Sequence, residues 1–210
     1  MSVIAEISEA LQQGKLADVK ALVQQALDAG EAPQAILEDG LLAGMGVIGE
    51  KFKNNEVYVP EVLIAARAMN AGAALLKPVL AEAGVEDKGV VVLGTVKGDL
   101  HDIGKNLVRM MMEGKGLRVI DLGVDVPVER FIGAAEEHNA RVIACSALLT
   151  TTMGEMKGVV DALNASKLAG NVRVMIGGAP VNQSFCDQIG ADAYTASAAD
   201  AADVAIRLCG

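Results

Sequence analysis

The sequence is poor in aromatic and basic side chains. It has no Trp, only 2% of its 210 residues are aromatic, and 18 Lys and Arg stand against 27 Asp and Glu, which gives a net charge of −9. Proteins that bind nucleic acids need a basic surface for the phosphates, and those that bind single strands add aromatic side chains for stacking. We therefore expect no nucleic acid among the partners.

Cysteine is also scarce. Cys145, Cys186 and Cys209 are widely spaced and form no Cys-x-x-Cys pair. Such a set is too small and too scattered for a disulfide framework or a thiolate metal site. We expect these residues to pack in the interior, with Cys209 as the candidate for an exposed thiol.

The sequence shows no export or membrane signal. Its first residues, MSVIAEISEALQQGKLADVKALV, lack a basic stretch followed by an apolar run, and no long uncharged apolar segment occurs further along. The sequence therefore predicts a cytoplasmic protein without a membrane partner.

Residues 1–84 have the pattern of an all-α four-helix bundle, because apolar residues recur at helical spacing through this segment. Three breaks separate the first helices: Gly14, residues 30–33 and residues 54–55. Pro60 lies where a proline commonly begins a helix, and we expect the fourth helix to run from Glu61 towards Leu80.

Residues 85–210 have instead the pattern of an α/β domain, and the charged, glycine-rich segment 83–89 marks the linker before it. Short β-branched runs alternate with helical stretches; the runs are Val90–Val96, Arg118–Leu122, Arg141–Ser146, Val172–Ile176 and Asp192–Thr195. Strands this apolar are typical of a parallel sheet covered by helices on both faces. We predict a parallel five-stranded sheet of the flavodoxin- or Rossmann-like type, with an assumed strand order of 2-1-3-4-5. Ligands of such folds bind beyond the carboxyl ends of the strands, where the strand order reverses.

The loop after the first strand contains the most informative motif, Asp99-x-His101-x-x-Gly104. A phosphate-binding P-loop does not fit, because the spacing from Gly98 to Gly104 is too long and Asn106 replaces the required hydroxyl, and the GxGxxG dinucleotide motif is absent. Asp99 can hold one imidazole nitrogen while the other points outward, which is how proteins orient a metal-binding histidine.

His138 is the other histidine of the sequence. It follows two glutamates near the end of a predicted helix, where a solvated or capping role is expected. A site with several histidine ligands is therefore not available. A metal at His101 would have to arrive inside a cofactor, such as a tetrapyrrole-like macrocycle, that fills its other coordination positions.

Two further loops end at the same predicted edge of the sheet. The third strand is followed by residues 146–152, Ser-Ala-Leu-Leu-Thr-Thr-Thr, which offer several hydroxyl groups, and the fourth strand ends at Gly177-Gly178. In the assumed strand order these loops and the His101 loop border one crevice.

The combination of Asp99-x-His101-x-x-Gly104, Ser146-x-Leu148 and Gly177-Gly178 resembles the B12-binding domain family, in which it marks base-off, histidine-on cobalamin binding. The N-terminal part is similar to the helical cap of methionine synthases and of corrinoid proteins from methanogens and acetogens. This second likeness rests on Met45-Gly46-x-x-Gly49-x-x-Phe52 and on Val59-Pro60-Glu61-Val62-Leu63. Together the two likenesses cover nearly the whole chain.

The resemblance implies a role for each matched residue. His101 would ligate cobalt from below, Asp99 would accept the other ring N–H of His101, and Thr152 stands where methionine synthases carry a serine that hydrogen-bonds the aspartate. The other residues implied to contact the cofactor in the sheet domain are Ile103, Gly104, Ser146, Leu148, Thr150, Gly177 and Gly178. In the helical part Phe52, Val59 and Val62 would cover the cofactor, although Val59 and Val62 fit the bundle core nearly as well.

The resemblance further implies a methyl carrier that is inactive alone and whose cobalamin, or a related corrinoid, cycles between Co(I) and methylcobalamin. Its implied partners are a substrate-specific corrinoid methyltransferase, a second methyltransferase using tetrahydrofolate or a thiol, and a reductive activase. The alternatives are the small cobalamin-binding subunit of a B12-dependent mutase, a B12 sensor and a flavodoxin-like domain without a cofactor. The sequence does not indicate the methyl donor.

Overall fold

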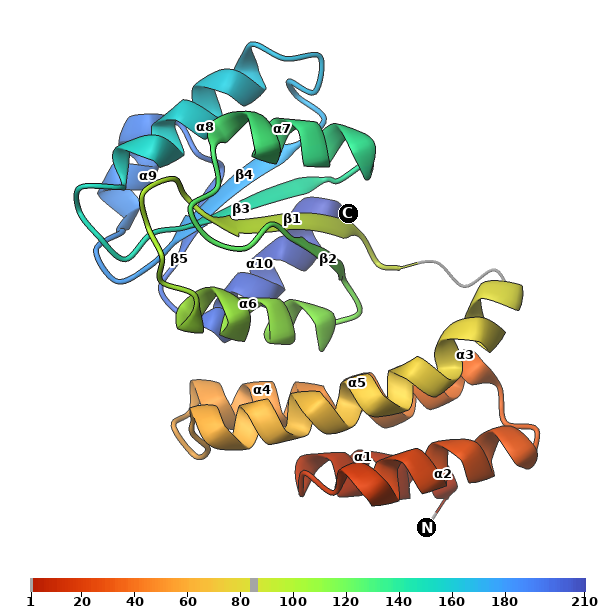
Figure 1. Ribbon diagram of the computed structural model, residues 1–210. Coiled ribbons are helices and arrows are strands. Elements are labelled where there is room, and N and C mark those ends of the chain that lie inside the picture. The colour runs from red at the N-terminus through yellow and green to blue at the C-terminus, as the bar shows by residue number, and fades with distance from the viewer. Residues whose placement is uncertain (1, 84–86) are drawn as a thin grey trace. The chain divides into compact units, whose positions relative to one another are not determined.

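The chain forms two compact units, residues 1–86 and residues 87–210. The computed structural model describes residues 2–83 and 87–210 (Figure 1). The predicted domain boundary between residues 84 and 85, with the central part of the linker, lies outside the described residues. We describe each unit by itself and name them the helical unit and the sheet unit.

The helical unit contains the four expected helical stretches among its described residues. The first two are α1 (Val3–Gln12) and α2 (Leu16–Asp28). The third is a continuous stretch made of α3 (Pro33–Ala35), the π-helix η1 (Ile36–Leu42) and α4 (Ala43–Lys53). The fourth is α5 (Val59–Glu82). Sequence periodicity did not predict the π-helical segment. The last helix begins at Val59, two residues before the expected start, and the Pro60 side chain is accommodated in its first turn, where no backbone N–H is needed.

Helix α5 is the core helix of this unit. It packs against α2, α4 and η1, and its Ala65, Ala66, Ala68 and Met69 are buried. Residues Val59–Leu80 are also long and apolar enough to cross a membrane by length and composition. A core helix can have the same composition, and packing accounts for the buried apolar side chains of α5, although Ile64 is exposed.

The sheet unit contains, within its described residues, a five-stranded parallel sheet in the order β2-β1-β3-β4-β5. The strands are β1 (Val90–Thr95), β2 (Arg118–Asp121), β3 (Val142–Ser146), β4 (Arg173–Gly177) and β5 (Ala193–Thr195). The predicted fold class and the assumed strand order are thus confirmed, and most strand ends differ from the prediction by one residue. The order reverses between β1 and β3, so the loops after these two strands flank the switch point.

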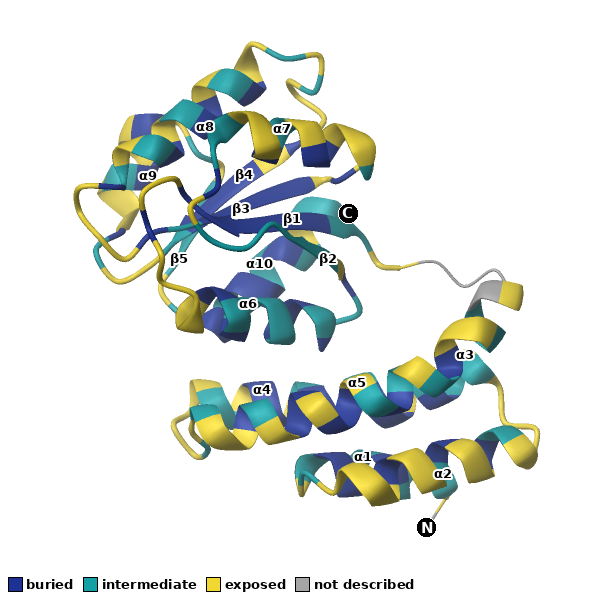
Figure 2. Ribbon diagram, viewed as in Figure 1, coloured by how far each residue is buried: buried dark blue, intermediate teal, exposed yellow. Residues whose placement is uncertain are grey.

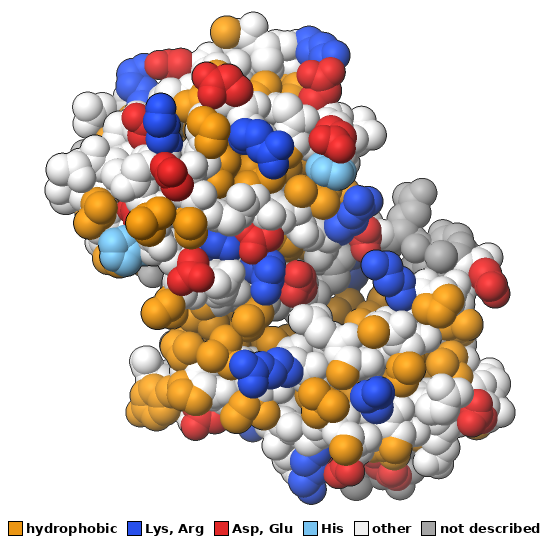
Figure 3. All heavy atoms as spheres, in the orientation of Figure 1, with side chains coloured by type: hydrophobic (Ala, Val, Ile, Leu, Met, Phe, Trp, Pro, Cys, Tyr) orange, Lys and Arg blue, Asp and Glu red, His pale blue; other side chains and the backbone are white. Residues whose placement is uncertain are grey.

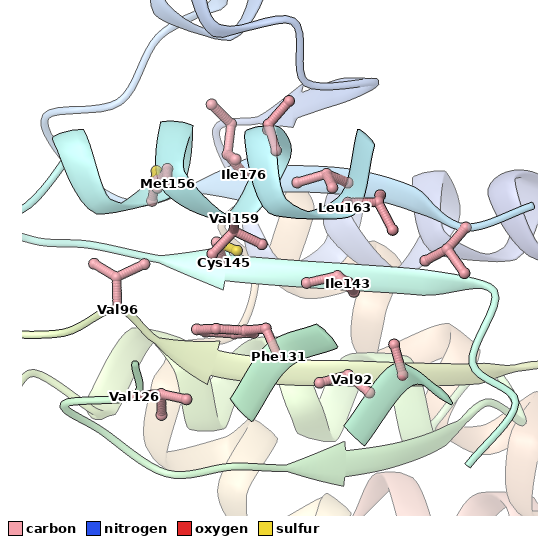
Figure 4. Packing of buried hydrophobic residues seen from close by; sticks show 14 of the residues in the cluster. Val92, Val96, Val126, Phe131, Ile143, Cys145, Met156, Val159, Leu163 and Ile176 are labelled. Carbon is pink, nitrogen blue, oxygen red and sulfur yellow. The ribbon is translucent and has the colours of Figure 1, made fainter. Parts of the chain in front are cut away.

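Helices cover both faces of the sheet (Figure 1). α7 (Val128–Glu137), α8 (Gly154–Asn164) and α9 (Gln183–Ile189) lie on one face, and α6 (Ile103–Glu113) and α10 (Ala198–Cys209) lie on the other. Figure 4 shows Phe131 of α7 and Val159 of α8 packed on Val92 and Ile143 of the central strands. The central strands β1, β3 and β4 are accordingly buried along most of their length, as Figure 2 shows, whereas the edge strands β2 and β5 are only partly buried. This rigid core fixes where the loops at the carboxyl ends begin.

Cys145 and Cys186 are buried in this core and Cys209 is partly exposed. Burial raises the pKa of the Cys145 thiol to about 12, and burial also raises that of Cys186. A thiol with a raised pKa stays protonated and is neither a nucleophile nor a metal ligand at neutral pH. The expected packing role is therefore the one that the structure assigns to Cys145 and Cys186.

Candidate functional site

Asp99 is the buried centre of the loop that follows β1. Its exposed fraction is 0%, and its carboxylate accepts several hydrogen bonds. Oδ1 accepts from the backbone N–H of His101 at 3.1 Å and lies 2.7 Å from His101 Nδ1. Oδ2 accepts from the N–H groups of Leu148 at 2.7 Å and Leu149 at 3.1 Å, and from the Thr152 hydroxyl at 3.0 Å. Asp99 therefore joins the loop after β1 to the loop after β3.

These contacts keep Asp99 ionised. Burial by itself raises the pKa of Asp99, but the hydrogen bonds from Leu148, from the His101 ring and from the His101 and Leu149 backbones lower it by more. The pKa lies well below the usual range for Asp. At neutral pH Asp99 is thus a carboxylate that can only accept protons in hydrogen bonds.

The ionised carboxylate determines which nitrogen of His101 carries the proton. Because Asp99 Oδ1 can only accept, Nδ1 at 2.7 Å must be the donor. In the tautomer with its single proton on Nδ1, the Nε2 atom keeps its lone pair. The side chain of His101 is half exposed, so this nitrogen belongs to a ring that a ligand can reach while Asp99 holds it in place.

Thr152 contributes less to holding the Asp99 carboxylate than its position suggests. Its hydroxyl lies 3.0 Å from Asp99 Oδ2 and 2.9 Å from the carbonyl oxygen of Leu149. A hydroxyl has one proton and can donate to only one of these acceptors at a time. Asp99 Oδ2 keeps its two backbone donors in either case, so the Thr152 hydrogen bond adds to an already satisfied carboxylate.

A cleft of about 350 Å³ lies beside His101, between the carboxyl ends of β1, β3, β4 and β5 and the helices α6 and α10. Small side chains line most of it, which is why space remains between the sheet and the helices. Among the predicted site residues, its lining includes His101, Gly104, Ser146, Leu148, Gly177 and Gly178. Ile103 is 76% exposed, Thr150 is exposed, and neither belongs to this lining.

Two glycines of the predicted site differ in what their surroundings demand. A Cβ added to Gly104 would meet no atom within 4 Å, so its small size is not needed for the packing of the chain itself. A Cβ added to Gly178 would lie 1.9 Å from the carbonyl oxygen of Ala147, and the φ of +132° favours glycine as well. The chain itself therefore demands glycine at position 178, whether or not a cofactor is bound. Gly104 instead borders open space in the lining of the cleft, where a side chain would take room that a ligand could use.

Exposed apolar side chains surround His101. The large hydrophobic residues that are exposed in the described part of the sheet unit are Leu100, Ile103, Leu148 and Leu149. They belong to the segments that follow β1 and β3, and Figure 3 shows hydrophobic side chains gathered at this edge of the unit. Apolar side chains clustered on a surface mark a binding site. Here they would accept an apolar ligand face next to the imidazole.

The predicted cover residues of the helical unit differ in exposure. Val62 has an exposed fraction of 0%, whereas Phe52 and Val59 are partly exposed. The burial of Val62 favours the packing role that its position in α5 also predicted.

Two polar contacts near the loop were not predicted from the sequence. The buried Thr95 hydroxyl donates to the carbonyl oxygen of His101 at 2.8 Å. Lys105, also buried, donates to both carboxylate oxygens of Asp121 at 2.6 and 2.7 Å, and Arg109 adds a bond to the same carboxylate at 3.1 Å. Thr95 could have been suspected as the polar end of an apolar strand. The Lys105–Asp121 pair joins α6 to the end of β2, and no local pattern predicts it.

Replacing Asp121 by asparagine is expected to destabilise the sheet unit by about 3 kcal/mol at pH 7. Breaking a buried ion pair from one side costs about 3–5 kcal/mol, and the lower value applies because asparagine retains one acceptor. Burial by itself raises the pKa of Asp121. The hydrogen bonds from Lys105 and Gly123 and the positive charges of Lys105 and Arg109 lower the pKa by more, so that the net shift is downward. The folded pKa is below the unfolded value of about 3.9, so the stabilisation is complete above that value and is lost as the pH falls through the folded pKa. Urea denaturation of both proteins between pH 7 and pH 3 should show the difference narrowing below about pH 4, and a difference independent of pH would contradict this account.

The site fits a metal that is carried by a cofactor. Among the described residues no group of three or more His, Cys, Asp and Glu side chains could hold a metal ion. The chain instead offers one oriented imidazole, exposed apolar side chains and a cleft with open space at Gly104. These features suit a corrinoid: His101 would hold its cobalt, the apolar side chains would lie beside the ring and the cleft would take the nucleotide tail.

Comparisons with known proteins agree with this class of site. Two models of the B12 binding domain match residues 89–206 and residues 3–77. The chain is 43% identical over 199 residues to a dimethylamine corrinoid protein of Methanosarcina barkeri, covering 94% of this chain and 93% of that one.

Two solved structures are also similar. The methanol:cobalamin methyltransferase complex of Methanosarcina barkeri matches with a TM-score of 0.88 and 34% identity, over 99% of this chain and 79% of the matched chain. A cobalamin-binding protein of Desulfitobacterium hafniense matches with a TM-score of 0.80 and 33% identity, over 99% and 98%. The chain therefore belongs to the B12-binding corrinoid proteins of methyltransferase systems.

Proposed function

We propose that this protein is a methyl carrier that holds a corrinoid with His101 on cobalt and passes methyl groups between two methyltransferases. The observation that carries the proposal is the half-exposed His101, fixed through Nδ1 by a buried, ionised Asp99 beside a cleft. When bound, the corrinoid would supply a cobalt atom that alternates between a nucleophilic Co(I) and a methylated form. The relatives named for dimethylamine and methanol systems support a methyltransferase context.

The residues of the chain would bind and orient this cofactor. Asp99 fixes the tautomer of His101 that leaves Nε2 free for the metal. Leu100, Ile103, Leu148 and Leu149 would exclude water from the ring, and the cleft along Gly104, Ser146 and Gly177 would hold the nucleotide tail. A carrier of this kind has no substrate pocket of its own, so a substrate-specific methyltransferase would deliver the methyl group. A second methyltransferase with a tetrahydrofolate or thiol acceptor would remove it, and a reductive activase would restore Co(I), all in the cytoplasm.

The proposal can be tested with the cobalamin-loaded full chain. After anaerobic reduction, the protein is mixed in turn with the methanol- and methylamine-specific methyltransferases of its relatives and their substrates. The visible spectrum should convert to that of the methylated cofactor with one of these pairs and not with substrate alone. If no pair methylates the bound cofactor while the carriers of the relatives respond in parallel, methanol and methylamines are not the donors. If the reduced, loaded protein is also not methylated by methyl iodide, the methyl-carrier function is wrong. A B12-dependent mutase subunit or a sensor then becomes the better explanation of the same site.

Replacing Gly104 by alanine is expected to weaken cobalamin binding by about 10- to 100-fold without destabilising the protein free of cofactor. Overpacking by one methyl group costs about 1–3 kcal/mol, and each tenfold in affinity corresponds to about 1.4 kcal/mol. In the free protein the new methyl group meets no atom within 4 Å. Thermal unfolding without cofactor and titration with cobalamin measure the two effects separately.

The Gly178→Ala variant is the matched control. Its methyl group would collide with the Ala147 carbonyl, so this variant should lower the thermal stability before any cofactor is added. Unchanged cobalamin affinity in Gly104→Ala would mean that the nucleotide tail does not occupy the cleft beside α6.

A further inference from the structure

Asp125 contacts the metal-ligand loop from a neighbouring segment of the chain. It lies between β2 and α7, and its Oδ1 accepts a hydrogen bond from the N–H of Gly98 at 2.7 Å. Its own backbone N–H donates to the carbonyl oxygen of Asp99 at 3.0 Å. These two bonds hold the Gly98–Asp99 dipeptide at both of its residues, and Asp99 is the residue that orients His101.

The backbone of Asp125 is in a conformation that is unfavourable for most residues. Its φ is +53°, in the left-handed region that glycine adopts readily and that asparagine and aspartate adopt occasionally. Asp125 is also exposed, so burial does not force it into this conformation. The two bonds to the Gly98–Asp99 dipeptide are the contacts that the strained backbone makes possible. Strain of this kind persists where the surrounding contacts stabilise it, and it is concentrated at functional sites.

The backbone position of Asp99 determines where its Oδ1 atom meets the His101 ring. The N–H groups of Leu148 and Leu149 hold the Oδ2 atom at the other side of the carboxylate, so a shift of Oδ1 would have to come from the backbone of Asp99. Gly98 precedes Asp99 and has a φ of +80°, a conformation that glycine adopts readily. The bond from its N–H to Asp125 holds the backbone here and so opposes a shift of the Asp99 Oδ1 atom away from the His101 ring.

We infer that Asp125 is a positioning residue for the cobalt ligand, acting on His101 through Gly98 and Asp99. The inference rests on the proposed function for its consequence, since the ring that is positioned is the one assigned to cobalt. Its structural part, the effect of Asp125 on the His101 ring, concerns the protein without cofactor and can be measured there.

Two substitutions separate the side-chain acceptor from the backbone conformation. Asp125→Asn keeps an acceptor oxygen and tolerates the positive φ, whereas Asp125→Gly removes the acceptor and relieves the strain, so that the fold should be retained. Asn139→Gly is the matched control, because Asn139 also has a positive φ of +51° and is exposed, but lies ahead of β3 at the opposite end of the sheet.

The first measurement uses the protein without cofactor. In Asp125→Gly we expect the amide proton of Gly98 to exchange with water at least about tenfold faster, and the ¹⁵N signals of the His101 ring to show a mixture of tautomers. Asp125→Asn and Asn139→Gly should retain the wild-type spectra and all three should keep the wild-type melting temperature.

The second measurement uses cobalamin. Outer-shell partners of metal ligands contribute about 10- to 100-fold in affinity, and we expect Asp125→Gly to lose about tenfold together with part of the histidine-on visible spectrum. Wild-type spectra at Gly98 and His101 in Asp125→Gly would overturn the inference. Failure of the wild-type protein to bind cobalamin histidine-on would refute the proposed function instead, and the spectra without cofactor would still decide the role of Asp125.

Discussion

Replacement of His101 by alanine is expected to remove the histidine-on spectrum of the cobalamin-loaded protein and to lower methyl transfer by more than about 100-fold. Losses of 10- to 100-fold are typical for residues that only support a metal ligand, and His101 is the ligand itself in our proposal. The fold should remain intact, because the side chain is half exposed. Asp99 also keeps its bonds to the backbone N–H groups of residues 101, 148 and 149.

The matched control is His138→Ala, which replaces the other histidine of the chain at the carboxyl-terminal cap of α7. This variant should keep the wild-type spectrum. Free imidazole added to His101→Ala offers a second check, since it can enter the space of the lost ring and should restore part of the histidine-on spectrum. An unchanged visible spectrum in His101→Ala would show that cobalt is not bound by this residue, and the assignment of the loop after β1 would be wrong.

The location of the site could be predicted from the sequence because it depends on features that are local in the chain. Apolar runs such as Val90–Val96 predict buried parallel strands, and in a parallel sheet all carboxyl ends lie at one edge. The loops with Asp99, Ser146 and Gly177 therefore had to be neighbours, and the structure places Ser146 and Gly177 together in the lining of one cleft with His101.

The supports of the site could not be predicted in the same way. Asp125 bonds to a residue 27 positions away and Lys105 to one 16 positions away, and neither separation follows a helical or strand period. The N–H groups of Leu148 and Leu149 bind Asp99 through the backbone, which the identity of a side chain does not reveal. The collision that makes glycine necessary at position 178 likewise depends on a carbonyl oxygen of a neighbouring loop.

Asp99→Asn is expected to have the second large effect, by reversing the tautomer of His101. An asparagine side chain presents one oxygen and one NH₂ group to the five donors that now surround the carboxylate. With the NH₂ group at the Oδ2 position, it would face the N–H groups of Leu148 and Leu149, which can only donate. With the NH₂ group at the Oδ1 position, it would face one backbone N–H and the His101 ring, which can change from donor to acceptor.

The second orientation is therefore favoured, and it places the ring proton on Nε2. A protonated Nε2 cannot bind cobalt without first losing that proton, so cobalamin affinity should fall by about 10- to 100-fold. The loss of activity in a serine protease triad after an Asp→Asn change has the same cause, because the substitution preserves the geometry but stabilises the wrong histidine tautomer. The ¹⁵N spectrum of the imidazole in the cofactor-free variant reports the tautomer directly, and titration with cobalamin reports the affinity.

Thr152→Val is the control that isolates the tautomer effect. It removes the hydroxyl contact to Asp99 but leaves the two backbone donors on Oδ2, so Nδ1 of His101 remains the donor to an ionised carboxylate. We expect less than about a tenfold loss of affinity, because a single shared hydrogen bond contributes about 0.5–1.5 kcal/mol. If Asp99→Asn keeps the wild-type tautomer and affinity, the carboxylate does not act by fixing the ring of His101. If Thr152→Val weakens cobalamin binding more than Asp99→Asn does, the hydroxyl of Thr152 has the larger role.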